Sequence, residues 1–180
     1  MSKKVLVISS SLRDGSNSDI MADSFIKGAA EVGCETEKIS LAGKEISFCE
    51  GCFACQNLGH CIIEDDAVKI VEKMLHADVI VFASPVYYYS ISGQLKTMLD
   101  RANPLFAMDY QFRQVYLLSC AAEDEKNTSF GSKTAIQGWV DCFEQAEFCG
   151  TVFAGGVTDP GDISGHPALQ QAYELGKSIK

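Results

Sequence analysis

Four cysteines within thirteen residues form the densest group of reactive side chains in this sequence. They lie in the stretch CEGCFACQNLGHC, with the spacing C-x2-C-x2-C-x5-C, at Cys49, Cys52, Cys55 and Cys61. The first three cysteines can present thiolates to three corners of a [4Fe–4S] cube, and Cys61 can supply the fourth. An iron–sulfur site at residues 49–61 is therefore one chemistry that this spacing allows.

Three other interpretations of this stretch stay open. Zinc is a weaker fit, because structural zinc sites usually use two separated C-x2-C pairs or add histidine, and His60 points away in most local geometries. A redox dithiol of Cys52 and Cys55 would need a helix start after a strand, and the preceding residues EISFCEG indicate only a weak strand. The last interpretation is a thiol loop without metal, which is either redox-labile or inherited without a function.

A second group of polar side chains lies in SSSLRDGSNSD, residues 9–19, ahead of a predicted helix. Hydroxyl, amide and guanidinium groups beside the free N–H groups of a helix N-terminus suit a doubly charged phosphate monoester. The alternative is an ordinary polar turn with a helix cap. The candidate phosphate ligands are Ser9, Ser11, Arg13, Ser16, Asn17 and Ser18.

A third stretch, SPVYYYSISGQLKTMLDR at residues 84–101, combines a proline turn with three consecutive tyrosines and several hydroxyls. Flat aromatic surfaces next to backbone donors suit a planar heteroaromatic ring with polar edges. A tyrosine-rich sheet edge or a self-association surface is the alternative. The stretch predicts a binding site for a ring only in combination with the phosphate loop.

The elements that position these stretches alternate between strands and helices. Near-continuous apolar runs are typical of parallel strands that are buried on both faces. The predicted strands are Val5–Ser9, Val79–Ser84, Val115–Cys120, Phe148–Gly155 and a weaker one near residues 35–41. Helical periodicity marks five helices, around Met21 and Phe25, Val68 and Val71, Leu95 and Leu99, Ile136 and Val140, and Ala168 and Ala172. This order predicts a doubly wound three-layer α/β sandwich with a five-stranded parallel sheet, in which ligands bind beyond the carboxyl ends of the strands.

Composition narrows the class of protein. At 180 residues and 47% hydrophobic content, the chain can build the core of one domain without disulfides. Its apolar runs are too short to cross a bilayer and no signal peptide is evident, so we expect a cytoplasmic protein. Its net charge of −9, without any block of basic residues, argues against nucleic-acid and membrane partners. In a reducing compartment, eight cysteines indicate thiols, metal ligands or redox chemistry.

Together the three stretches resemble the NAD(P)H-dependent FMN reductase branch of flavodoxin-like proteins. Ser10–Arg13 followed by Ser16–Ser18 is similar to the phosphate loop G-S-x-R…G-N-T of that branch, with Ser10 at the usual glycine. Pro85–Tyr88 is similar to its flavin-ring loop. The cysteine stretch, followed by Asp65, resembles the insert of the iron–sulfur flavoprotein members.

This resemblance implies a single flavodoxin-like FMN-binding domain over residues 1–180, with a cysteine-rich insert at residues 49–61. It assigns the FMN phosphate to the loop of residues 9–19 and a [4Fe–4S] cluster to the four cysteines of the insert. Lys96 and Arg101 are expected to set their helix and a subunit interface. The residues expected along or near the flavin ring are Pro85, Val86, Tyr87, Tyr88, Ser119, Cys120 and Ala121.

The implied function is an FMN-dependent oxidoreductase. It would pass electrons from NAD(P)H, or from a small carrier protein, to a flavin, a quinone or another acceptor, with the cluster as a relay if it is present. No protein side chain is required as a nucleophile, since the cofactor carries the chemistry. The family also implies a homodimer or homotetramer in which the insert of a neighbouring subunit approaches the flavin.

Two readings from other classes of protein remain. One is a flavodoxin-like electron carrier without substrate turnover of its own, whose acidic surface would dock to a basic partner. The other is an interaction module in which zinc stabilises the insert. The four isolated cysteines are predicted to be small buried hydrophobic residues, with Cys120 at the end of a strand near the flavin. They are Cys34, Cys120, Cys142 and Cys149.

Overall fold

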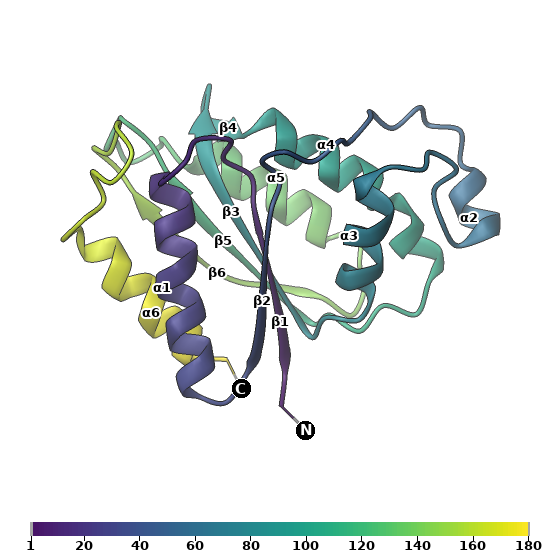
Figure 1. Cartoon of the computed structure of the whole chain (residues 1–180), viewed down its shortest axis with the longest axis horizontal. Helices are drawn as coiled ribbons and strands as arrows, with labels where there is room; N and C mark the ends of the chain where they lie inside the picture. Colours follow the sequence, from purple (N-terminus) through teal and green to yellow (C-terminus); the bar gives the residue numbers. More distant parts are fainter. Residues whose placement is uncertain (1, 180) are drawn as a thin grey trace.

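A parallel sheet forms the centre of the molecule (Figure 1). In the computed structural model, which describes residues 2–179, five parallel strands follow the order β2-β1-β3-β5-β6, and the short β4 pairs antiparallel with β3. The strands are β1 (Lys4–Ser9), β2 (Glu35–Ser40), β3 (Val79–Tyr87), β4 (Ser90–Ile91), β5 (Gln114–Cys120) and β6 (Glu147–Ala154). This order is that of flavodoxin-like folds, with the reversal between β1 and β3. The predicted five-stranded parallel sheet is confirmed.

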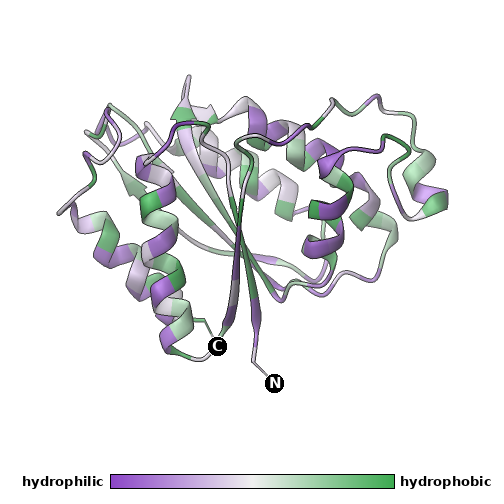
Figure 2. Cartoon of the chain, in the orientation of Figure 1, coloured by the Kyte–Doolittle hydropathy of each residue, from purple (hydrophilic) through white to green (hydrophobic). Residues whose placement is uncertain are grey.

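Helices cover both faces of the sheet, as the doubly wound prediction requires. One face packs against α1 (Asn17–Glu31) and α6 (Pro167–Lys177). The other packs against α3 (Asp66–Leu75), α4 (Gly93–Arg101) and α5 (Phe130–Val140). Figure 2 shows apolar residues along the central strands and charged or polar residues on the outer sides of the helices. Two short helices, α2 (Ala54–Leu58) and η1 (Asn103–Ala107), lie at one end of the molecule beyond α3 (Figure 1).

Helices α1 and α6 touch through their backbones. A Cβ atom at Gly28 would collide with the carbonyl group of Tyr173, and one at Gly176 would collide with that of Phe25. Glycine at both positions therefore allows the two helices to cross closely. This crossing fixes the position of α1, whose N-terminus faces the carboxyl edge of the sheet.

The burial predicted for three isolated cysteines is wrong. Cys120 is buried as expected, but Cys34 is half-buried, and Cys142 and Cys149 are exposed. Cys142 follows the end of α5, and Cys149 lies on β6, which is an edge strand with one side less covered. An apolar run identifies a strand but does not reveal whether that strand lies at the edge of the sheet.

Within residues 2–179 no helix has the length and apolar content needed to cross a bilayer.

Candidate functional site

A cavity of about 250 Å³ opens at the carboxyl ends of β1, β3 and β5. This is the edge of the sheet at which the reversal of strand order predicts a ligand. Its walls come from the loops that follow β1, β3, β5 and β6. Among the predicted cofactor ligands, the cavity is lined by Ser11, Arg13, Ser16, Asn17, Ser18, Pro85, Val86, Tyr87, Cys120 and Ala121.

The N-terminus of α1 supplies donors to this cavity. Ser16 caps the helix, because its hydroxyl accepts a hydrogen bond of 3.3 Å from the backbone N–H of Asp19. Ser18 is fully buried, and its hydroxyl has no hydrogen-bond partner among residues 2–179. An unused buried hydroxyl at a helix N-terminus is a group that could bind an anion.

Arg13 lies beside the cavity, held by the loop after β6. Its Nη1 donates a 2.8 Å hydrogen bond to the carbonyl of Thr158, and its Nη2 lies 3.8 Å from the Asp159 carboxylate. The loop is stiffened by Asp162, whose carboxylate accepts hydrogen bonds from the N–H groups of Asp159 and Thr158. These bonds lower the pKa of Asp162. The half-exposed guanidinium therefore keeps a donor edge toward solvent and the cavity.

Asn17 also bonds to this loop. Its side-chain amide donates to the carbonyl of Asp159 at 3.0 Å, and its Oδ1 accepts from the N–H of Ile163 at 3.2 Å. Asn17 thus lines the cavity as predicted, but its carboxamide ties α1 to the loop. The contribution of this loop was missed by the sequence analysis, although TDPGD follows a predicted strand in the same way as the other loops. The additional lining residues are Val157, Thr158 and Pro160.

A tight hairpin between β3 and β4 forms another wall. Tyr88 and Tyr89 occupy its two turn positions with φ of 48° and 62°, a left-handed conformation that is uncommon for aromatic residues. The carbonyl group of Tyr89 lies against Gly131 on α5, where a Cβ atom would collide with it. Tyr87 lines the cavity, whereas the ring of Tyr88 is fully exposed at the tip and does not.

Cys120 places a neutral thiol in the cavity wall. Burial raises the pKa of this thiol to about 11, although the nearby polar groups of Ser18 act in the opposite direction. The two remaining predicted ligands, Ser9 and Ser119, are buried within the sheet and do not line the cavity. Cys120 points toward the cavity, and the adjacent Ser119 therefore points to the opposite face of the sheet, because neighbouring residues of a strand alternate between its two faces.

The four cysteines of the insert line one small cavity of about 20 Å³, together with Arg101 and Asn103. The amide of Asn103 lies 3.1 Å from the sulfur of Cys55, and the N–H of Gly51 lies 3.5 Å from the sulfur of Cys49. Within residues 2–179, no three His, Cys, Asp or Glu side chains converge on a point that would hold a single metal ion. Four thiols around one space, with N–H donors to sulfur, are a donor set that suits the larger body of an iron–sulfur cluster.

The backbone of the insert reverses direction repeatedly around this space. Gly51, Phe53 and Gly59 all adopt left-handed conformations, with φ of 66°, 56° and 72°. Phe53 precedes the five residues of α2, and Cys55 is the buried thiol of the four. These turns bring cysteines from both sides of α2 to one cavity.

Arg101 differs from its prediction as an interface residue. It is 1% exposed, and its guanidinium pairs with both carboxylate oxygens of Asp65 at 2.6 and 2.9 Å. A side chain that is buried within its own chain cannot form a subunit contact. Lys96 is exposed and pairs with Asp100 on the same helix.

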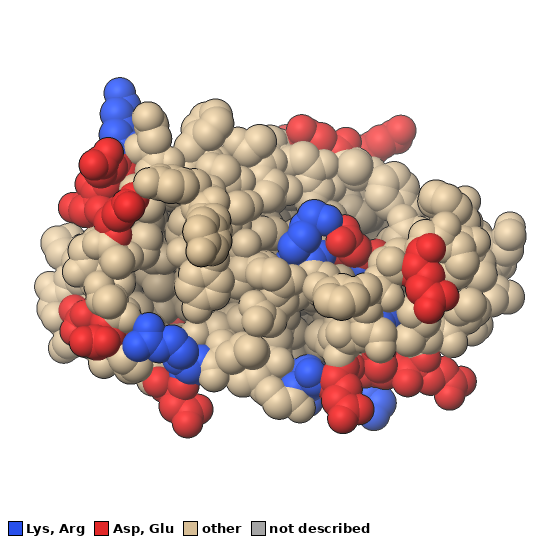
Figure 3. Space-filling model, turned by 90° about the horizontal axis from the view of Figure 1, so that it is seen from above, with Lys and Arg blue, Asp and Glu red and all other residues tan. Residues whose placement is uncertain are grey.

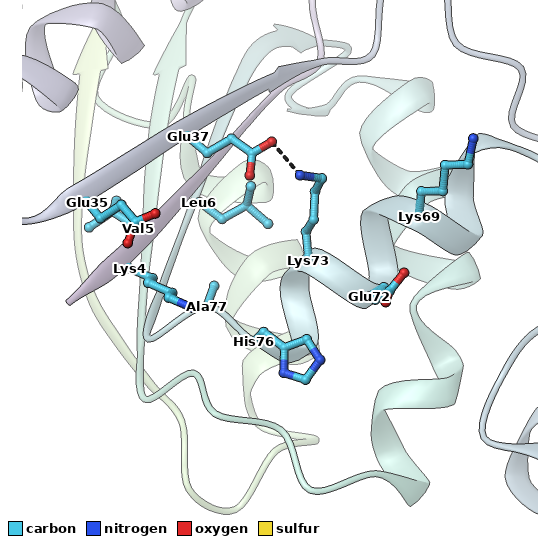
Figure 4. Close-up of a pocket in the computed structure, with 10 residues that line it drawn as sticks. All are labelled: Lys4, Val5, Leu6, Glu35, Glu37, Lys69, Glu72, Lys73, His76 and Ala77. Atoms are coloured by element: carbon cyan, nitrogen blue, oxygen red, sulfur yellow. Dashed lines mark hydrogen bonds and ion pairs between the residues drawn. The ribbon is translucent and has the colours of Figure 1, made fainter. Parts of the chain in front are cut away.

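A larger cavity, of about 610 Å³, lies away from both sites, near the starts of β1 and β2 and the end of α3. Figure 4 shows Glu37 and Lys73 facing each other across it, at 2.6 Å, with His76 at the end of the helix. None of the predicted ligands lines this groove, and its charged side chains belong to an edge strand and a helix surface. Size alone therefore does not identify the functional site in this molecule.

Residues 3–136 match the family described as NADPH-dependent FMN reductase. The chain belongs to this family. Membership confirms the predicted resemblance, an oxidoreductase activity and FMN as the cofactor.

The chain is also similar to individual proteins and to a solved structure. The chain is 40% identical over 134 residues to an iron-sulfur flavoprotein of Methanocaldococcus jannaschii, which covers 74% of this chain and 68% of that protein. It is 30% identical over 172 residues to an iron-sulfur flavoprotein of Methanosarcina thermophila, covering 96% and 87%. An NAD(P)H:quinone oxidoreductase from Methanothermobacter marburgensis has the same fold, with a TM-score of 0.77 at 18% identity over 100% of this chain and 97% of that one.

Proposed function

We propose that residues 1–180 form one FMN-binding unit that accepts a hydride from NAD(P)H, or electrons from a small carrier protein, and delivers electrons to a flavin, quinone or other acceptor. The observation that carries this proposal is the 250 Å³ cavity, which gathers residues from four separate post-strand loops. When bound, FMN supplies the hydride and electron chemistry. The protein supplies binding, orientation and the exclusion of water.

The phosphate end of FMN would lie at the N-terminus of α1. Ser11, Ser16 and Ser18 offer hydroxyl groups there, and the first turn of the helix offers backbone N–H groups. Arg13 adds a positive charge, which matters in a chain with a net charge of −9. Together these groups satisfy a dianion in a protein whose overall charge would repel it.

The flavin ring would lie between the hairpin and the loop after β5. Pro85, Val86 and Tyr87 offer one wall, and Cys120 and Ala121 offer another. The Cys120 thiol stays neutral near pH 7 because burial raises its pKa to about 11. This wall therefore adds no charge beside the ring, and hydride transfer from a nicotinamide needs no proton from the protein.

The four thiols of the insert would hold a [4Fe–4S] cluster that relays single electrons to or from the flavin site. The four cysteines Cys49, Cys52, Cys55 and Cys61 line one cavity, which supports this assignment. So does the name iron-sulfur flavoprotein borne by two relatives. Zinc would require the same sulfurs to close around a single ion.

Exposed apolar side chains support a homodimer or homotetramer. Figure 3 shows the face at the carboxyl edge of the sheet, where acidic side chains gather at the rim and uncharged residues form most of the middle. Exposed apolar side chains that gather into a patch commonly mark interfaces. Sedimentation analysis tests this point, since Phe53→Ser would shift an oligomer toward monomer. The exposed side chains are Phe48, Phe53, Leu58 and Ile62 on the insert, and Tyr88, Tyr89 and Phe130 near the hairpin.

The decisive experiment is an anaerobic purification followed by a visible spectrum, assays of iron and sulfide, and turnover with NADH or NADPH and a quinone. Flavin bands, about four irons per chain and nicotinamide oxidation are expected. Flavin without iron would reject the relay but keep the reductase. A protein that holds no flavin would overturn the assignment of the 250 Å³ cavity.

A further inference from the structure

One buried ion pair joins the two ends of the cysteine insert. The Arg101 side chain comes from the last turn of α4 and is completely buried. Its Nη1 and Nη2 donate to the two carboxylate oxygens of Asp65, at 2.6 and 2.9 Å. Asp65 also caps α3, since its carboxylate accepts a 3.0 Å hydrogen bond from the N–H of Ala67. The pair thereby connects two helices.

The same two side chains hold the backbone on both sides of the insert. Nη1 of Arg101 donates to the carbonyl of Ser47 at 2.9 Å, and Nη2 donates to that of Ile63 at 3.0 Å. Asp65 accepts a 2.8 Å hydrogen bond from the N–H of Ser47. Ser47 lies two residues before the first cysteine of the insert, and Ile63 lies two residues after the last one. Both entry and exit of the insert are therefore fixed to one guanidinium.

A single donor of Arg101 is left over. Its Nε–H is buried and has no hydrogen-bond partner in the part of the chain that the structure describes. Arg101 lines the four-cysteine cavity. Cys61 lines the same small cavity, so its sulfur lies near the guanidinium whose Nε–H is unused.

We propose that Arg101 is a positioning residue of the iron–sulfur site, which closes the insert through its Nη groups and directs its Nε–H and its charge at the sulfur of Cys61. This inference rests on the proposed cluster. A cation and a hydrogen-bond donor at a ligand sulfur favour the reduced cluster, which carries more negative charge. Asp65 offsets part of this effect, because its carboxylate lies against the same guanidinium.

Two substitutions with opposite expected signs test the inference. In anaerobically purified protein, Arg101→Gln should make the cluster harder to reduce, by about tenfold in the reduction equilibrium, or about 59 mV for one electron. Asp65→Asn should make the cluster easier to reduce, because it leaves the charge of Arg101 uncompensated while asparagine still caps α3. A purely structural role of the pair would not give shifts of opposite sign. Reduction is followed by electron paramagnetic resonance.

Arg113→Gln is the matched control. This exposed arginine also donates to backbone carbonyls, those of Tyr110 and Phe112, but it does not line the cysteine cavity. We expect the wild-type potential in this variant. If Arg101→Gln does not fold, Arg101→Lys is used instead. It retains the charge without the Nε–H of arginine, so it should lower the reduction potential of the cluster by a smaller amount.

Iron content and a metal-free measurement separate the outcomes. Limited proteolysis of the iron-free protein should cut within residues 49–61 faster in Arg101→Gln than in wild type, because the ends of the insert are released. Suppose that the wild-type protein binds iron and that Arg101→Gln and Asp65→Asn leave the reduction potential of the cluster unchanged. That result would overturn the role of Arg101 but keep the cluster. Wild-type protein that binds no iron would overturn the cluster and this role together.

Discussion

The proposed FMN cavity and the four-cysteine cavity are built in different ways. The walls of the 250 Å³ cavity, which is the proposed FMN site, follow directly from parallel strands, so hydrogen bonds of the sheet fix their positions. The four-cysteine cavity is formed by a stretch with one five-residue helix, and the Arg101–Asp65 pair holds its ends. The first site is a property of the fold, whereas the second depends on local turns and on one ion pair. Changes to the two sites should therefore have separable consequences.

The largest expected effect separates the two sites completely. Cys52→Ala should reduce iron from about four atoms per chain to nearly none, because a cluster that lacks one of its thiolates is not retained. FMN content should not change. Cys142→Ala is the matched control, since both thiols are exposed. Iron and flavin assays on anaerobically purified protein measure both outcomes, and full iron in Cys52→Ala would contradict the assignment of ligands.

The next effect compares how fast a thiol from each site is modified in protein that holds neither iron nor FMN. Because burial raises the pKa of Cys120 to about 11, only about a thousandth of it is thiolate at pH 8. Iodoacetamide should therefore modify Cys120 at least about a hundredfold more slowly than the exposed Cys52. The Cys120 rate should rise about tenfold per pH unit until about pH 11. Mass spectrometry of quenched samples measures both rates, and equal rates at pH 8 would contradict the burial of Cys120.

A smaller effect concerns the rigid hairpin of the FMN site. Gly131→Ala should lower the free energy of unfolding by about 2 kcal/mol, because its Cβ atom would collide with the Tyr89 carbonyl. Gly138→Ala lies on the same helix, and its Cβ atom would meet no other atom within 4 Å in the described chain. It should raise the free energy of unfolding by up to about 1 kcal/mol through helix propensity. Urea denaturation distinguishes the two variants, and equal values would show that the hairpin moves aside freely.

The smallest effect tests whether a buried hydroxyl of the proposed FMN site, which has no partner in the described chain, contributes to FMN binding. Ser18→Ala removes a buried hydroxyl that has no partner within residues 2–179. The FMN-free protein should gain about 1 kcal/mol in its free energy of unfolding, while FMN affinity should fall about tenfold. Ser132→Ala removes another unpartnered buried hydroxyl of the described chain, outside the cavity, and should change only stability. Flavin titration would contradict the prediction if both variants bound FMN equally.

Much of the 250 Å³ cavity could be predicted from sequence because it follows from topology. Once the apolar runs are assigned to a parallel sheet, the residues after β1, β3 and β5 must meet at one edge. The loop after β6 obeys the same rule, but its residues TDPGD contain no arrangement typical of a cofactor site. The use of the Asn17 amide to hold that loop depends on a contact across 142 residues. Sequence spacing contains no information about such a contact.

The cysteine insert shows the opposite balance. Its four thiols were found from spacing alone, because they lie within thirteen residues. Arg101, which fixes the ends of the insert, was instead predicted at a subunit interface. Its partner Asp65 lies 36 positions earlier in the sequence, and a polar residue on a helix is usually exposed. Burial of a charge depends on a partner from another element, and that partner becomes visible only in three dimensions.

The close crossing of α1 and α6 has a consequence for the order in which this protein becomes functional. The helix that would bind the FMN phosphate is synthesised well before the helix that supports it, and well before the loop held by its Asn17. A nascent chain that has not reached residue 177 lacks the surface against which Gly28 packs. FMN capture should therefore follow translation of α6.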